Sequence, residues 1–117
     1  MTIDIKKLKI DWFDRIKVVN FPSWYDIGIK SISSDPDMIL YYIDDLYDVD
    51  DFIDLCAISR LPKQNRVIVV YRKGRKDGVN RDTVCMPFWT NPDFAMKAPM
   101  LCSISNELSA FVMMYIR

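Results

Sequence analysis

The stretch RVIVVYR, residues 66–72, carries the clearest secondary-structure signal in the chain. Its β-branched and aromatic side chains are typical of a β-strand. The segment KGRKDG, residues 73–78, follows with an Asp-Gly turn signal, and Thr83–Trp89 then has the composition of a returning strand. We therefore expect a central hairpin over about residues 66–89. Pro87 places its second strand at a sheet edge or next to a bulge.

Upstream of this hairpin, apolar residues recur every three or four positions from residue 39 to residue 56, as in an amphipathic helix. Asp35 can cap that helix, and Pro36 suits its first position. Aspartates step along the opposite side. The pattern predicts a central acidic helix that ends near Ser59, or a helix pair broken near residues 48–50, because aspartate is a poor residue for a helix interior.

The two ends of the chain carry weaker patterns. Over residues 4–19 the apolar spacing predicts an N-terminal helix, although residues 7–12 also alternate as a strand does. A short strand is expected over residues 25–33. From Ser103 or Ser105 onward, apolar spacing predicts a C-terminal helix, and the segment FVMMYI in it also fits a strand.

These elements together predict an α+β fold in a single domain spanning residues 1–117. A small antiparallel sheet, formed by the central hairpin, would pack with the N-terminal helix, the central acidic helix or helix pair, and the C-terminal helix. Half of the residues are apolar, which is enough for a sizeable core.

The composition also indicates which class of protein this is and where it is expected to act. The formal net charge is zero, from 16 basic and 16 acidic residues, which argues against a general polyanion binder. No run of 18 apolar residues predicts a membrane span, and the first 15 residues lack a signal-peptide pattern. Three cysteines, an odd number without paired spacing, favour reduced thiols in a cytoplasm. Glu107 is the only glutamate beside abundant Asp, Ile, Lys and Asn, a bias found in AT-rich phage and viral genomes. The expected location is then the host cytoplasm.

Several classes of chemistry have no residues to support them. The chain contains no histidine, so Ser-His-Asp and Cys-His catalysis and histidine metal ligation are excluded. The cysteines lack zinc-site spacing, and the aspartate-rich segment lacks the glycine and glutamate of a calcium-binding EF-hand loop. No glycine-rich phosphate loop occurs. We expect a protein that is not an enzyme and has no cofactor and no metal; a pair of hydrolytic aspartates remains the open alternative.

The charges are sorted along the chain. Residues 31–59 contain eight aspartates and no lysine or arginine, although a solvated helix usually mixes both signs. This imbalance predicts a small, non-enzymatic accessory protein that presents an acidic helical face to a basic protein partner. The candidate contact residues are Asp44, Asp45, Asp48 and Asp51. If that face is only solvated, replacing Asp44, Asp48 and Asp51 with asparagine should leave the melting temperature the same or higher and should keep every partner.

The alternative function uses the opposite charge. Residues 71–81 would place basic side chains on the predicted hairpin, where they could contact nucleic acid or an acidic partner. The candidates are Arg72, Lys73, Arg75, Lys76 and Arg81. Trp24, Phe88 and Trp89 could stack on bases, but aromatic residues near prolines are more often part of a core.

Overall fold

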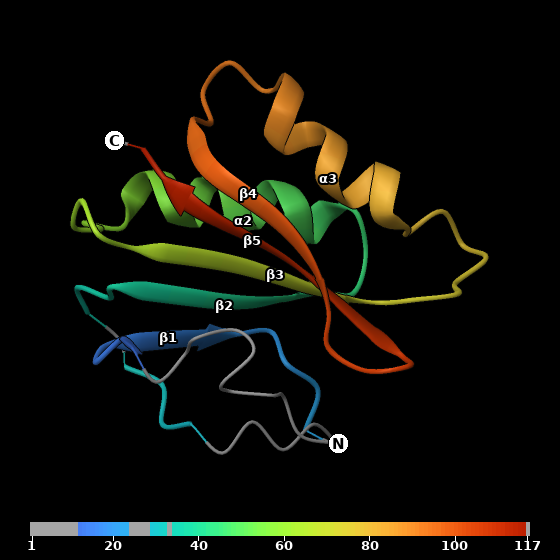
Figure 1. Cartoon of the computed structure of the whole chain (residues 1–117), viewed down its shortest axis with the longest axis horizontal. Helices are drawn as coiled ribbons and strands as arrows, with labels where there is room; N and C mark the ends of the chain where they lie inside the picture. Colours follow the sequence, from blue (N-terminus) through green and yellow to red (C-terminus); the bar gives the residue numbers. More distant parts are fainter. Residues whose placement is uncertain (1–11, 24–28, 33, 117) are drawn as a thin grey trace.

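A computed structural model describes residues 12–23, 29–32 and 34–116 of the chain, and all its strands belong to one five-stranded mixed sheet (Figure 1). The strand order is β1-β2-β3-β5-β4; β1, β2 and β3 run parallel, and β5 runs antiparallel to both β3 and β4. Among the described residues, the helices α2 and α3 connect the strands. The elements are β1 (Ile16–Val19), β2 (Met38–Ile43), α2 (Tyr47–Ile58), β3 (Arg66–Arg72), α3 (Arg81–Thr90), β4 (Met96–Ser103) and β5 (Leu108–Tyr115).

The sheet has a hydrophobic cluster on each face, because side chains alternate along every strand. Val67 and Val69 of β3 pack on the face that both helices cover. Ile68 and Val70 pack on the opposite face. This two-sided burial explains the continuous apolar run that marks β3 in the sequence.

The helix-covered face is held by a group of aromatic rings. Phe52 of α2 lies 5.5 Å from Phe88 of α3, ring centre to ring centre, in an edge-to-face arrangement. Phe94, in the turn after α3, lies 5.2 Å from Phe88. Edge-to-face ring pairs stabilise a core beyond simple burial, so these contacts hold α2 and α3 side by side on one layer of the molecule.

The second face is covered by segments without regular structure. Phe13, Phe21 and Ile29 pack against the cluster that Leu40 and Tyr42 of β2 contribute to it. The Phe21 and Tyr42 rings lie 5.5 Å apart. β2 is therefore buried on both sides, and all six of its residues are inaccessible to solvent or nearly so.

The predicted central hairpin is wrong, although its first strand is confirmed with the expected bounds of β3. Residues 81–90 form α3 instead of a returning strand. Asn80 Oδ1 accepts a hydrogen bond from the Thr83 N–H at 3.0 Å, and Thr83 Oγ1 accepts one from the Asn80 N–H at 2.9 Å. This reciprocal pair is a capping box, and it starts a helix in a segment whose composition resembles a strand.

The predicted central helix is right only over its second half. Residues 38–43 form β2, and the helix begins at Tyr47. The predicted C-terminal helix is wrong, because residues 108–115 form β5, which pairs with both β3 and β4. The antiparallel sheet expected from the sequence is accordingly a mixed sheet; the α+β class is retained.

The N-terminal helix predicted over residues 4–19 is also wrong where the structure describes it. Residues 16–19 form β1, parallel to β2, while residues 1–11 lie outside the described part of the chain. Of the strand predicted over residues 25–33, residues 29–32 are described and form no strand. They bind β1 instead: the Ile32 N–H donates to the Ile16 carbonyl at 3.0 Å, and the Val18 N–H donates to Ser31 Oγ at 2.9 Å.

Candidate functional site

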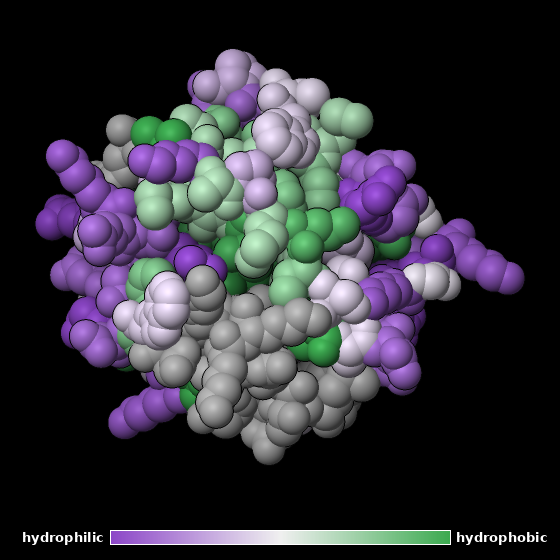
Figure 2. Space-filling view, in the orientation of Figure 1, coloured by the Kyte–Doolittle hydropathy of each residue, from purple (hydrophilic) through white to green (hydrophobic). Residues whose placement is uncertain are grey.

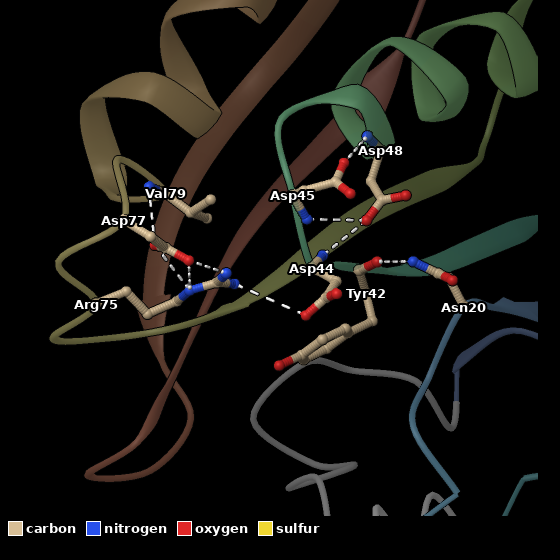
Figure 3. Close-up of polar contacts among 8 residues, drawn as sticks. All are labelled: Asn20, Tyr42, Asp44, Asp45, Asp48, Arg75, Asp77 and Val79. Atoms are coloured by element: carbon tan, nitrogen blue, oxygen red, sulfur yellow. Dashed lines mark hydrogen bonds and ion pairs between the residues drawn. The ribbon is translucent and has the colours of Figure 1, made fainter.

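The carboxyl ends of the three parallel strands bring several predicted site residues to one edge of the sheet. Asn20 follows β1, Asp44 follows β2 and Lys73 follows β3. In sheets with parallel strands, ligands are commonly bound at this edge. The side chain of Asn20 donates to the Tyr42 carbonyl at 2.9 Å, so it ties the end of β1 to the end of β2 (Figure 3).

The aspartates at this edge organise the start of α2. The carboxylate of Asp48 accepts hydrogen bonds from the backbone N–H groups of Asp44 and Asp45, at 2.8 and 3.0 Å. The carboxylate of Asp45 accepts one from the Asp48 N–H at 3.2 Å (Figure 3). The first turn of a helix has no intrahelical acceptor for its N–H groups, so Asp45 supplies one for Asp48, while Asp48 fixes the turn that leads into the helix. Asp45 and Asp48, predicted as contact residues, therefore have a structural role.

Arg75 joins the two oppositely charged segments of the sequence. Its guanidinium binds both carboxylate oxygens of Asp77, with Nε at 3.1 and 3.2 Å from them, and it lies 3.9 Å from Asp44 (Figure 3). The side chain of Arg75 is only 10% exposed. The hydrogen bond that Arg75 donates to Asp77 raises the pKa of Arg75 and lowers the pKa of Asp77. Arg75 is consequently a link within the protein.

Lys73 is likewise held by its own chain. Its Nζ donates to the Ser105 carbonyl at 2.7 Å and to Ser103 Oγ, both near the turn between β4 and β5. The remaining predicted basic residues, Arg72, Lys76 and Arg81, are exposed. Three of the five basic candidates thus remain available for an external contact.

The residues outside this edge lie on separate surfaces. Asp51 is exposed on α2. Arg81 begins α3, and its Nε lies 3.4 Å from Asp82 with both side chains mostly exposed. An exposed pair of this kind contributes little stability. The sequence-predicted acidic residues Asp44 and Asp51 and the basic residue Arg81 are not brought into one site.

A groove between α3 and the edge of the sheet was not predicted. It has a volume of about 310 Å³, and we call it the α3–β4 groove; its lining residues are Arg81, Asp82, Cys85, Met86, Trp89, Leu101 and Phe111. Trp89 is 63% exposed, whereas its neighbour Phe88 is buried in the core. The expectation that both aromatic residues fill the core is right for Phe88 and wrong for Trp89. Trp24 lies outside the described residues.

The missed groove had one local signal in the sequence. Asn80 and Thr83 stand at the spacing of a capping box, and starting a helix there would have put Met86 and Trp89 on one side of it. Figure 2 shows hydrophobic side chains gathered over β4 and β5, and hydrophilic ones over the loop that follows β3.

The described residues provide neither a reactive thiol nor a metal cluster. The three cysteines are free and buried, and burial raises the pKa of the Cys85 thiol to about 11. A thiol in this state is a poor nucleophile at neutral pH. Among residues 12–23, 29–32 and 34–116, no three or more cysteine or acidic side chains lie close enough to hold a metal ion.

A second cavity of about 600 Å³ lies at the opposite end of β5. Lys63 and Lys97 line it together with apolar residues that include Met114 and Ile116. No carboxylate or thiol contributes to its wall, and its ionisable side chains are Lys63, Lys97 and Tyr115.

In the described part of the chain, no helix has both the length and the apolar character needed to cross a membrane. No protein-family model matches the sequence, and neither a curated protein nor a solved structure matches it.

Proposed function

We propose that this protein is a small, non-enzymatic binding protein that presents the outer face of α2 to a basic region of a protein partner. This acidic α2 face consists of Tyr47, Asp50, Asp51, Asp54 and Ile58. Their spacing of three or four residues places them along one side of the helix. All five side chains are exposed.

The exposure of two large side chains carries the proposal. Tyr47 is 80% exposed and Ile58 is 78% exposed, at opposite ends of the acidic α2 face. Solvation accounts for exposed aspartates, but it does not favour an aromatic and a branched aliphatic side chain in water. Exposed aromatic side chains with polar groups around them are enriched at protein-binding surfaces.

The electrostatics of the face support a basic partner. α2 contains no lysine or arginine, and its carboxylates Asp50 and Asp54 stand four residues apart as like charges. Such a pair slightly destabilises an isolated helix. A basic partner would relieve this repulsion and would be steered toward the face as it approaches.

The composition supports a phage or viral origin and a cytoplasmic location for this binding protein. The bias toward Asp, Asn, Lys and Ile favours an accessory protein of phage or viral origin, and the unpaired cysteines favour action in the host cytoplasm.

The test compares two variants of equal charge. One replaces Asp50, Asp51 and Asp54 with asparagine; the control replaces Asp14, Asp93 and Glu107 with asparagine or glutamine, three exposed acidic residues elsewhere. Each protein is immobilised and used to capture partners from nuclease-treated lysate, with quantification by mass spectrometry. We expect one partner to be retained by wild type and control, and to be reduced at least about tenfold by the α2 variant.

Two further measurements complete this experiment. Tyr47→Ala is expected to reduce capture of the same partner without lowering the melting temperature, because the ring is exposed. Equal capture by the wild type and a folded α2 variant would contradict the proposal.

A further inference from the structure

The two edge strands of the sheet, β1 and β4, differ in how far their outer sides are covered by the rest of the chain. At the β1 edge, Ser31 and Ile32 take part in hydrogen bonds with the strand. β4, at the other edge, pairs with β5 alone among the described residues, and Met100 and Leu101 of β4 are 45% and 46% exposed. An edge strand with exposed apolar side chains is a template for pairing with another chain.

Only the second half of β4 is regular enough to pair. Between Lys97 and Met100 the register shifts, Ala98 has a φ of 53°, and Pro99 lacks an N–H donor. A bulge and a proline commonly protect an edge from pairing. The protection ends at Met100, so residues 100–102 form a short open segment.

The alternating hydrogen bonds of β5 identify one residue of that segment whose backbone N–H and carbonyl face outward. The Lys73 N–H donates to the Glu107 carbonyl, and the Ile104 N–H donates to the Leu108 carbonyl. Hydrogen-bonded pairs alternate along an antiparallel ladder, so odd-numbered residues of β5 bond to β3 and even-numbered residues bond to β4. Leu101 lies opposite Phe111, an odd-numbered residue. Its N–H and carbonyl therefore point away from β5.

The side chain of Leu101 lies on the helix-covered side, since Phe111 opposite it belongs to the cluster there. It lines the α3–β4 groove with Met86 and Trp89 of α3. An extended peptide that bonded to the Leu101 backbone would direct alternate side chains toward this groove. Met and Trp side chains are suited to pack around an inserted apolar side chain.

The charged side chains around the groove determine whether an acidic or a basic partner is favoured. Arg81 and Leu101 also line an adjoining hollow of about 210 Å³, together with Lys73, whose side chain lies on the same face of the sheet as that of Tyr71. The acidic side chain in the groove, Asp82, forms an exposed pair with Arg81 at 3.4 Å. A pair of that kind is weak enough to exchange for another carboxylate. The mouth of the groove is thus apolar inside and basic at one end.

We propose that residues 100–102 of β4, through the outward N–H and carbonyl of Leu101, bind an extended acidic peptide of another protein, which adds to the sheet as a new edge strand. One apolar side chain of the peptide inserts between Trp89 and Leu101, and a neighbouring carboxylate lies beside Arg81. This surface is separate from the acidic α2 face, so the inference does not depend on the function proposed above.

The test uses a fluorescein-labelled heptapeptide of alternating glutamate and leucine, read by fluorescence anisotropy. Two matched peptides are compared: one has lysine in place of glutamate, and one carries N-methyl groups on alternate amides. We expect the acidic peptide to bind at least about tenfold more tightly than either, because charge and edge hydrogen bonds are both required.

Protein variants separate the parts of the site. Trp89→Ala, Arg81→Glu and Leu101→Pro should each weaken binding about tenfold or more. Leu101→Pro removes an N–H that points out of the sheet, so circular dichroism is expected to show a native fold. The control Lys76→Glu should bind as the wild type does. A triple variant of Asp50, Asp51 and Asp54 should also bind normally, which separates this surface from the acidic α2 face.

Three outcomes would overturn the proposal. The first is equal binding of the acidic and lysine peptides. The second is undiminished binding by the N-methylated peptide or by folded Leu101→Pro. The third is a concentration-dependent dimer in sedimentation that Leu101→Pro abolishes, which would assign the edge to a second copy of this chain.

Discussion

At the scale of single residues, charge in this protein is used in two ways. Arg75, Lys73, Asp45 and Asp48 satisfy groups within the chain, although they stand in segments whose charge suggests external contacts. Nothing in the sequence separates them from the exposed Arg72 or Asp51, because their roles depend on which backbone groups the fold brings near. The sequence pattern reveals the charged segments, but tertiary contacts decide which of their side chains are available for an external contact.

The Arg75–Asp77 pair predicts a pH dependence of stability. The pKa of Asp77 is lowered in the folded protein, so the pair stabilises the fold above the ordinary Asp pKa of 3.8 and loses this effect as pH falls below it. Asp77→Asn should lower the melting temperature at pH 7, while the gap to wild type should shrink toward pH 3. Differential scanning fluorimetry across this range measures it.

The control for this prediction is Asp93→Asn, a change of the same charge at an exposed position in the turn after α3. Its melting temperature should differ little from the wild type at neutral pH. A gap between wild type and Asp77→Asn that stays constant from pH 7 to pH 3 would show that the carboxylate charge of Asp77 does not act through Arg75.

At the scale of elements, the sequence predicted those with local signals and failed where tertiary burial decides. β3 was predicted with its bounds, because its β-branched run has no competing interpretation. β2, MILYYI, is apolar at every position, and a continuous apolar run fits a helix spacing by chance as well as a strand buried on both faces. Only the neighbouring strands resolve that ambiguity.

The helix α3 was missed for a related reason. Its β-branched and aromatic residues favour a strand by propensity, and Pro87 is unusual inside a helix. The capping box at Asn80 and the burial of Phe88 between α2 and β5 outweigh these preferences. The α3–β4 groove could not be predicted without this helix, nor without β4, which Pro99 concealed.

The start of α2 gives a prediction that separates a structural from a surface aspartate. Asp48→Ala should lower the free energy of unfolding by about 0.5–2 kcal/mol, because two backbone N–H groups lose their acceptor. Asp51→Ala, on the exposed face, should change it by less than about 0.5 kcal/mol. Urea unfolding followed by circular dichroism compares them. Equal effects would mean that the Asp48 carboxylate does not stabilise the start of α2.

At the scale of the whole molecule, the two charged segments do not form opposed faces. Arg75 lies against Asp44 at the carboxyl edge of the sheet, so opposite charges partly neutralise each other there. What remains is the acidic α2 face on one side and the basic mouth of the α3–β4 groove on another. A molecule of zero net charge with two such surfaces is suited to oriented binding of protein partners.

This arrangement predicts weak binding to nucleic acid, the alternative function considered for residues 71–81. Of the five basic candidates, Lys73 and Arg75 are engaged within the chain, which leaves Arg72, Lys76 and Arg81 for phosphates. Each phosphate contact contributes about 0.9 to the slope of log affinity against log salt. For a random 20-base-pair duplex at low salt, we therefore expect weak binding with a slope no steeper than about −3.

Fluorescence anisotropy between 20 and 200 mM salt measures both the affinity and this slope, with Arg75→Glu and Lys76→Glu as a matched pair. Since Arg75 faces inward, its replacement should affect binding no more than that of Lys76. Sub-micromolar affinity that disappears in Arg75→Glu alone, in a variant that remains folded, would favour the nucleic-acid function over the protein-binding one.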